Sequence, residues 1–391
     1  MKEEECSQLL ILGNGFDLAC NLKSSFNDFY NEYFIDSETV DVFNISYFGN
    51  FIPSRYIKYG IVDLAILTST IQKNKNILWR DVESIISDLA DTGRSTINLR
   101  RIQSVILNSM DNNSLDILEK NQSNQIRKVS YTLRSQIMNQ GGGHILSNKK
   151  NLNLLLMAML KNSIYNFEQS FKDYMCKNLD KCSAWYKDNA EKVYSHLASG
   201  KEKETYVINF NYTSINKNDF YEYINVHGNL DSEEVIFGID ESVINKENDE
   251  FYDLTKTYRK MILDARLKVR NKSLPKYIKA IKFFGHSLGK ADYAYFRSIF
   301  DFYNIYDSDI VLIFYYYNYA KSEDLLAQQT KNVIKLLKNY GESFSGDLEK
   351  KGDNLVHKLS LEGRLQVQEI KINYDGMLGS QPGRIILNVQ E

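Results

Sequence analysis

The sequence is poor in proline, cysteine and histidine, with 3, 4 and 5 of each in 391 residues. Few prolines favour long helices, because proline interrupts the helical hydrogen-bond pattern. None of the cysteines forms a Cys-x-x-Cys pair, which argues against a zinc ribbon, and their low density argues against a disulfide framework. They stand at Cys6, Cys20, Cys176 and Cys182.

A charge excess of one sign and long apolar runs are also missing. The formal net charge is −2, from 48 basic and 50 acidic residues, so nucleic acid is not expected as a partner. The longest apolar runs, 154–160 and 310–317, are too short to span a bilayer. The polar, acidic start Met-Lys-Glu-Glu-Glu is not that of a signal peptide. We therefore expect a cytoplasmic protein without a membrane partner.

The first residues do contain a strand, a glycine turn and a helix start. Leu9–Leu12 are apolar without a break, which is typical of a strand buried on both faces of a parallel sheet. Gly-Asn-Gly follows at 13–15, and from Asp17 to Tyr33 apolar residues recur with a helical period. This arrangement points backbone N–H groups at an anion. The same residues also fit a tight turn with Asp17 as the helix cap.

The remaining pattern predicts a mainly parallel, three-layer α/β sheet with a large helical insertion. Residues 79–200 are mostly helical, whereas residues 35–75 are irregular and aromatic. We predict an α/β domain of residues 1–75 and 201–391, with residues 76–200 spliced into it as a helical subdomain. Strands are expected at 206–210, 223–226, 235–238, 277–284, 310–314 and 365–370, alternating with helices at 253–270, 292–302 and 325–337.

Three strands after the first one end in polar residues. The stretches are Asn-Phe-Asn-Tyr-Thr at 209–213, Val-His-Gly-Asn-Leu at 226–230 and Gly-His-Ser-Leu-Gly-Lys-Ala-Asp at 285–292. In an open α/β sheet, ligands bind at the carboxyl ends of the strands. These stretches and the Gly-Asn-Gly turn are therefore expected to converge on one crevice.

The same stretches carry a family resemblance. Gly-Asn-Gly-Phe-Asp at 13–17, Phe-Asn-Tyr-Thr at 210–213, His-Gly-Asn-Leu at 227–230 and the segment 285–292 resemble motifs of the AbiH family of bacteriophage abortive-infection proteins. Trp-Arg-Asp-Val-Glu at 79–83 also resembles a stretch of that family. The resemblance runs through the chain from end to end. It implies an antiphage role and a phage-derived trigger as a partner.

More distantly, the order of motifs is similar to the Rossmann-like (sirtuin-like) NAD-binding fold. This resemblance implies hydrolysis of the nicotinamide–ribose bond of NAD⁺, with NAD as substrate or ligand and with no metal. It implies that Asn211 lies near the nicotinamide ribose and that His227 acts as the base. Asp17 stands where sirtuins place a small hydroxyl residue, so it is expected to bind a ribose hydroxyl, act in catalysis or cap the helix.

The resemblance also implies a set of nucleotide-binding residues. Gly13 and Gly15 are expected at the phosphates, and Gly285 and Ser287 on the adenosine side. The chemistry fits these residue types, because nicotinamide leaves as a neutral molecule and needs no general acid. An Asn amide both donates and accepts, and a histidine accepts a proton near neutral pH. The other expected binding residues are Asn14, Phe16, Gly228, His286 and Asp292.

Other interpretations stay open at this point. The pocket of a non-catalytic sensor would bind an ADP-ribose-type nucleotide and signal to a partner through the helical block, which is also the expected surface for a homo-oligomer. A metal-dependent nuclease would use Asp17, Asp81 and Glu83. Each residue also has a structural interpretation: Asn211 as a turn former, His227 as a core histidine, and Asp292 as a helix cap.

Overall fold

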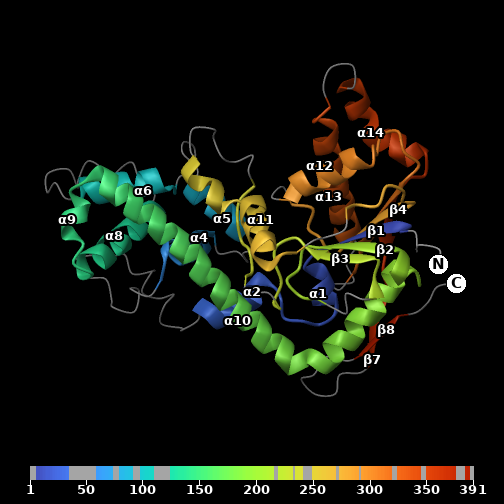
Figure 1. The fold of residues 1–391 in the computed structure, drawn as a ribbon, viewed down its shortest axis with the longest axis horizontal. Coiled ribbons are helices and arrows are strands. Elements are labelled where there is room, and N and C mark those ends of the chain that lie inside the picture. The colour runs from blue at the N-terminus through green and yellow to red at the C-terminus, as the bar shows by residue number, and fades with distance from the viewer. Residues whose placement is uncertain are drawn as a thin grey trace. The chain divides into compact units, whose positions relative to one another are not determined.

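The computed structural model describes the chain in segments, most of which form two compact units (Figure 1). The sheet unit comprises residues 1–24, 175–235 and 263–391, and the helical unit comprises residues 25–174 and 236–262. The domain boundaries expected from the sequence stay a prediction, and the units differ from them in the assignment of 25–75, 175–200 and 236–262. The described segments are 6–34, 59–73, 79–90, 97–109, 124–214, 219–231, 234–240, 249–269, 273–289, 292–318, 324–344, 349–375 and 384–387.

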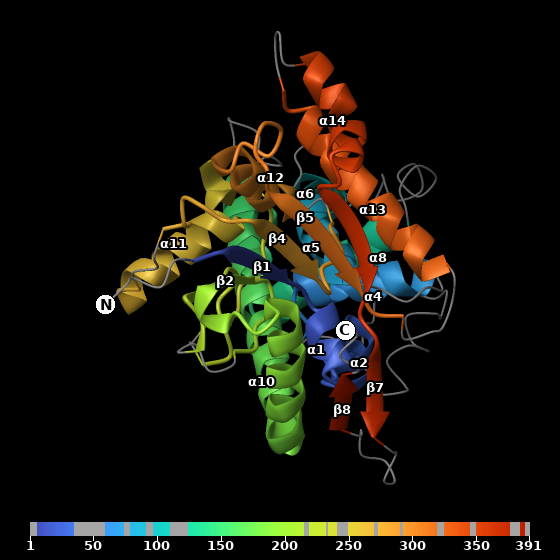
Figure 2. The same ribbon diagram turned by 90° about the vertical axis from the view of Figure 1, so that its right-hand side faces the viewer.

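A six-stranded parallel sheet forms the centre of the sheet unit (Figure 2). Its strand order is β3-β2-β1-β4-β5-β6, which is the order of doubly wound nucleotide-binding folds. The topological switch point, where the strand order reverses, lies between β1 and β4. The parallel Rossmann-like sheet predicted from the sequence is therefore confirmed. The strands are β1 (Gln8–Leu12), β2 (Thr205–Asn209), β3 (Glu222–Asn225), β4 (Ala280–Phe284), β5 (Val311–Tyr316) and β6 (Leu365–Glu369).

Helices cover both faces of this sheet. Ile11 and Phe283 pack in one apolar core with α12 (Tyr293–Phe302) and α13 (Asp324–Gly341), because alternate strand residues point to the same face. On the opposite face, Gln8 and Lys282 donate to the last carbonyls of α10 (Lys149–Ala198), with Nε2 2.7 Å from Ala198 O and Nζ 2.7 Å from Leu197 O. These donors satisfy carbonyl groups that a helix end leaves open. The helices are α1 (Gly15–Ala19), α12 (Tyr293–Phe302), α13 (Asp324–Gly341) and α14 (Glu349–Leu361).

The helical block is inserted between two neighbouring strands, as predicted. Leu10 of β1 lies opposite Val207 of β2, although residues 13–204 separate the two strands in sequence. The long helix α10 (Lys149–Ala198) contributes residues to both units, with the change after Tyr174. The other helices of the helical unit are α2 (Phe26–Phe34), α4 (Ile61–Lys73), α5 (Trp79–Ala90), α6 (Leu99–Asn108), α8 (Asn124–Asn139) and α9 (Gly143–Leu146), with η5 (Asp249–Leu254) and the start of α11 (Lys256–Leu267).

One expected irregular segment is in fact helical. Within the stretch 35–75, residues 35–58 lie outside the described part of the chain, but 61–73 form α4. Residues 61–67 of α4 are all buried, Asp63 among them. A helix that is buried on every side has no polar face opposite an apolar one, so a search for helical periodicity misses it.

The single helix expected from Asp17 to Tyr33 is two helices. α1 ends at Ala19, Asn21 has a φ of +64°, and α2 begins at Phe26. Because α1 begins at Gly15 with Asn14 at its N-cap, Asp17 lies inside the helix and is not its cap. Leu18, one of the apolar residues in the predicted single helix, is 42% exposed as a consequence.

The short strand expected at 235–238 is also absent from the structure. Gly228 and Val235 form only an isolated bridge. Side chains satisfy the backbone groups that a ladder would use: Glu168 Oε1 accepts from Phe237 N–H at 2.7 Å, and Arg259 Nη1 donates to Phe237 O at 2.7 Å. An antiparallel pair that the sequence analysis missed, β7 (Ile372–Asp375) and β8 (Arg384–Leu387), lies near the C-terminal end.

Candidate functional site

A carboxylate between two imidazoles lies at the carboxyl edge of the sheet. Asp292 Oδ1 is 3.4 Å from His227 Nε2, and its Oδ2 is 3.4 Å from His286 Nε2. The two histidine side chains are each 5% exposed and the aspartate is 14% exposed. Both contacts are longer than strong hydrogen bonds. We call these three residues the His-Asp-His cluster.

Strand ends and a helix start place the three side chains. His227 directly follows β3 and the bridge residue Val226, and His286 is the second residue after β4. Asp292 occupies the N-cap position of α12, yet its side chain makes no capping hydrogen bond. Its carboxylate contacts the two imidazoles instead. The position expected for a helix cap is therefore confirmed, and the capping bond is absent.

Aromatic side chains surround the cluster. The ring of Phe210 lies 5.4 Å from His227 and 4.6 Å from His286, in each case at a steep angle. Tyr295, on the first turn of α12, lies 5.8 Å from His227, and Phe296 lies 5.0 Å from His286. Apolar rings lower the local dielectric constant, so the charge of Asp292 acts more strongly on the imidazoles than it would in water.

A backbone contact sets the protonation of one histidine. Nδ1 of His286 accepts a hydrogen bond from the Leu288 N–H at 2.9 Å, so in the neutral ring the proton is on Nε2, which faces Asp292. His227 also presents Nε2 to Asp292, which makes its Nδ1 the basic nitrogen. The lone pair of the His286 ring thus already accepts a hydrogen bond. The His227 ring is oriented by the carboxylate of Asp292, as the histidine of a hydrolase triad is oriented by its aspartate.

The predicted glycines allow two strand-end loops to touch backbone to backbone. A Cβ on Gly13 would lie 2.4 Å from His286 Cα, and a Cβ on Gly15 would lie 2.6 Å from Gly285 Cα. The Gly15 N–H donates to Gly285 O at 2.8 Å, and the Phe16 N–H donates to Gly13 O at 2.9 Å. Close packing is therefore a sufficient reason for these glycines. Their expected contact with phosphates stays a prediction.

Asn211 braces the loop that follows β2. Its Nδ2 donates to Gly13 O at 3.0 Å, and its backbone carbonyl accepts from Asn225 Nδ2 at 2.9 Å. Asn225 Nδ2 also lies 3.0 Å from Thr213 O, and Asn209 Nδ2 donates to the same carbonyl at 2.8 Å. The side chain of Asn211 is 2% exposed, and its amide joins the loop after β2 to the loop after β1.

Asp17 is buried in a network of hydroxyl groups. Its carboxylate accepts from Tyr186 at 2.7 Å and from Thr213 at 2.9 Å, and it is 1% exposed. Burial raises the pKa of this carboxyl from 3.8 to about 7, although both hydrogen bonds oppose the shift. The Asp17 carboxyl therefore gains or loses its proton near neutral pH.

The three predicted catalytic residues belong to two groups. Asn211 and Asp17 are linked through Thr213, on the side of the sheet that α10 covers. His227 lies in the His-Asp-His cluster with α12, which packs against the opposite face. The other predicted residues have the following surroundings. Asn14 donates to Ser24 O at 3.1 Å, and Phe16 packs on Tyr194 and Phe284. Gly228 has a φ of +77° and lies beside Glu234 O, whereas Ser287 is exposed.

The acids of the nuclease alternative have other roles where the structure describes them. Glu83 forms an ion pair with Lys256 at 2.6 Å, and the lysine side chain is 3% exposed. Asp17 accepts its hydrogen bonds within the sheet unit. In the described parts of the chain, no group of three or more His, Cys, Asp or Glu side chains is arranged to hold a metal ion.

The sequence analysis missed Tyr186, Thr213 and Tyr295 as site residues. Thr213 was inside a quoted motif, but its role depends on Asp17, which is 196 residues away. Tyr186 lies in a long helical stretch, where a tyrosine is most often an ordinary core residue. Tyr295 carries one usable signal, since it lies three residues after Asp292, one turn along the same helix.

The fold and the cluster together define a class: a Rossmann-like α/β protein with a histidine–carboxylate site at the carboxyl edge of its sheet. Within that class, the family model for bacteriophage abortive infection AbiH matches residues 9–316, so the chain belongs to the AbiH family. No curated protein and no solved structure matches the chain significantly. None of the helices in the described segments is long and apolar enough to cross a membrane.

Proposed function

We propose that this AbiH protein acts in abortive infection by hydrolysing the nicotinamide–ribose bond of NAD⁺ or of a related nucleotide. The single observation that carries the proposal is the His-Asp-His cluster at the carboxyl edge of a sheet with the dinucleotide-binding strand order. A phage-derived trigger and a nucleotide ligand are the partners that this activity requires. Loss of NAD⁺ would stop the metabolism of an infected cell and with it the production of phage.

His227 is the proposed general base. In the reaction, water adds to C1′ of the ribose, and the C1′–N bond breaks with its electron pair on the nicotinamide nitrogen. The proton of water passes to Nδ1 of His227, so the products are nicotinamide, ADP-ribose and one proton. This nitrogen is buried in the structure, so the step requires that substrate binding opens the site to water. A positioned base of this kind contributes about 10²- to 10⁴-fold in rate. Nicotinamide leaves neutral, so no general acid is needed.

Asp292 and His286 are proposed as positioning residues. Asp292 holds Nε2 of His227 and stabilises the imidazolium that forms when Nδ1 takes the proton. His286 is held in turn by the Leu288 N–H, and it fixes the second oxygen of the carboxylate. Both apo contacts of 3.4 Å would shorten as charge develops in the transition state.

Asn211 is proposed to hold the site in shape, because its buried amide joins two of the strand-end loops. Its amide donates to Gly13 O, so it keeps the turn after β1 against the strand end that precedes the cluster. Tyr295, which is only partly buried beside His227, is proposed to supply the aromatic surface against which a flat nicotinamide ring packs.

The test is nicotinamide release from NAD⁺ by the purified full chain, with and without chelator. We expect release by the wild type, loss in His227→Ala, and full activity in the matched control His357→Ala, because His357 is exposed on α14. Asp292→Asn should lower the rate by about 10²-fold or more. Chelator should have no effect.

A second measurement covers the case in which the enzyme needs its trigger. NAD⁺ is measured in cells expressing each variant, before and after phage infection. We expect a fall only after infection and only with an intact His227. Protection from phage without any fall in NAD⁺ would refute the hydrolase. Tight binding of ADP-ribose without release would instead identify the sensor.

A further inference from the structure

Two asparagines at neighbouring strand ends hold the loop that follows β2, residues 210–214. Asn209 and Asn225 are the last residues of β2 and β3, and they are paired in the parallel register. Residues paired in this way point to the same face of a sheet. Both are buried, and neither was among the site residues expected from the sequence. We call them the asparagine pair.

The amide of Asn225 is fully used on this loop. An asparagine amide has two N–H donors and one carbonyl acceptor. Nδ2 of Asn225 donates to Asn211 O at 2.9 Å and to Thr213 O at 3.0 Å. Its Oδ1 accepts from Ser214 Oγ at 3.1 Å. One side chain at the end of β3 therefore holds three residues of the loop that belongs to the next strand.

Asn209 holds the same loop from the end of β2. Its Nδ2 donates to Thr213 O at 2.8 Å, and its Oδ1 accepts from the Asn211 N–H at 3.1 Å. Nδ2 also donates to the hydroxyl group of Tyr223 on β3 at 2.8 Å. Thr213 O thus accepts from both members of the asparagine pair. The loop is fixed in place, because a buried donor that loses its acceptor is costly.

This loop connects the asparagine pair to the two histidines. Phe210, its first residue, packs on both imidazoles, with ring centroids 5.4 Å from His227 and 4.6 Å from His286. The next residue, Asn211, donates from its side chain to Gly13 O. A Cβ on Gly13 would lie only 2.4 Å from His286 Cα, so these two backbones touch. Contacts therefore run from the end of β3 through two loops to the loop after β4.

The two histidines need such a connection because their strands are not neighbours. The strand order places β2 and β1 between β3 and β4. Neighbouring strands are about 4.8 Å apart, so β3 and β4 are separated by about 14 Å. Asp292 nevertheless contacts the imidazoles that follow both strands. The ladder of the sheet ends with the strands, so contacts between the loops hold the imidazoles at this spacing.

We infer that Asn209 and Asn225 are positioning residues that hold His227 and His286 at the spacing of the Asp292 carboxylate. This role rests on the proposed function, because it serves the same reaction. The asparagine pair acts through the loop after β2 and through the ring of Phe210. A catalytic group that is misplaced by about 1 Å can cost about 10²-fold in rate, so residues outside the cluster can have a large effect.

The first test is spectroscopic and needs no substrate. The chain has five histidines, so isotope-labelled histidine gives few ring signals by NMR, and His227→Ala and His286→Ala assign two of them. The ring current of Phe210 shifts both signals, and Phe210→Leu removes this shift. Asn225→Asp keeps Oδ1 and loses both N–H donors. We expect both imidazole signals in this variant to move toward their positions in Phe210→Leu.

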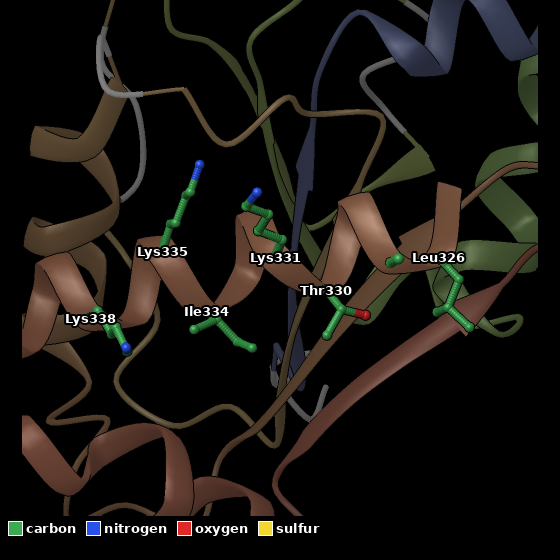
Figure 3. Close-up of a pocket in the computed structure, with 7 residues that line it drawn as sticks. Leu326, Thr330, Lys331, Ile334, Lys335 and Lys338 are labelled. Atoms are coloured by element: carbon green, nitrogen blue, oxygen red, sulfur yellow. The ribbon is translucent and has the colours of Figure 1, made fainter. Parts of the chain in front are cut away.

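Two control variants separate the asparagine pair from other effects of substitution. Asn189→Asp also places a carboxylate in the core, but Asn189 lies on α10 and its Oδ1 can still accept from the Ile385 N–H. Lys335→Ala changes the exposed side of α13, from which Figure 3 shows this lysine extending. Both should leave the two imidazole signals in place. Circular dichroism verifies folding, and Asn225→Ala replaces Asn225→Asp if the buried charge unfolds the chain.

The second test measures the kinetics of nicotinamide release from NAD⁺. Asn225→Asp should lower kcat by about 10²-fold and change KM by less than about threefold. The reason is that the asparagine positions the base and does not bind the substrate. Asn189→Asp and Lys335→Ala should release nicotinamide like the wild type. A fall in stability alone would lower the thermal midpoint and leave kcat of the folded enzyme unchanged.

The two tests separate this role from the proposed reaction. Imidazole signals that move only in the Asn225 variants, without any loss of NAD⁺ in infected cells, would support the positioning role and refute the hydrolase. Signals that stay in place in these variants would overturn the positioning role, whatever the activity. An equal movement in Asn189→Asp would also overturn it, because the buried charge would then be the cause. So would an unchanged kcat of an Asn225 variant in an active enzyme.

Discussion

Replacing Asp17 with asparagine should change how stability depends on pH. The Asp17 carboxyl has a pKa of about 7 in the folded protein, raised by burial from 3.8. The folded state therefore keeps this proton at a pH where the unfolded state has lost it. The stability that Asp17 provides is fully present below about pH 4 and is lost as pH rises toward 7.

The size of the effect follows from the two pKa values. Each unit of difference corresponds to about 1.36 kcal/mol, so ionisation of Asp17 removes about 4 kcal/mol from the free energy of unfolding once pH exceeds 7. About 2.5 kcal/mol of this loss falls between pH 5 and pH 8. The asparagine of the variant would not titrate, and the hydroxyl groups of Tyr186 and Thr213 can rotate to suit its amide.

The assay is urea unfolding of the wild type and of Asp17→Asn at several pH values from 5 to 8. The stability of the variant minus that of the wild type should rise by about 2.5 kcal/mol over this range. Asp63, whose pKa burial also raises to about 7, is present in both proteins, so its contribution cancels. A difference that stays flat or falls with pH would refute the buried, titrating carboxyl.

Three further substitutions, two of them with a control substitution, test contacts within the two units. Glu168→Gln should cost about 3 kcal/mol in urea unfolding, because Arg259 loses its buried carboxylate, whereas Arg266→Gln at an exposed pair should cost less than about 1 kcal/mol. Gly285→Ala should lower the thermal midpoint strongly, since its Cβ would lie 2.3 Å from Phe16 N at a φ of +72°, while Gly289→Ala should be tolerated. An equal midpoint for the two alanine variants would contradict the close backbone contact. Gln8→Ala should cost about 1 kcal/mol by removing the donor at the end of α10, and no loss would mean that water replaces it.

Local patterns predicted most of the elements that form the sheet. The unbroken apolar run before Gly13 became the central strand β1, and the alternating run at 365–370 became the edge strand β6. A strand buried on both faces is a continuous apolar run, and a strand buried on one face alternates apolar and polar residues. Such strands can therefore be recognised from the sequence alone. α4 was missed because complete burial removes the helical period.

The three members of the His-Asp-His cluster were singled out in the sequence, but the contacts between them were not. His227, His286 and Asp292 were all singled out, each at the end of a strand or the start of a helix. The structure decides that the carboxylate of Asp292 lies between the two imidazoles. No spacing in the chain predicts this, because residues after different strands meet only when the sheet has formed.

The amino-acid sequence by itself determined the sheet, the helical insertion, the family and the polar strand ends, since these depend on short-range patterns and on motifs. Only the tertiary structure decided what each polar group does. The sequence alone allowed Asp17 to be a helix cap, yet it lies inside α1 and accepts a hydrogen bond from Tyr186, 169 residues further along the chain. The cost of removing a charge from water depends on every atom that surrounds it, and those atoms come from segments that only folding brings together.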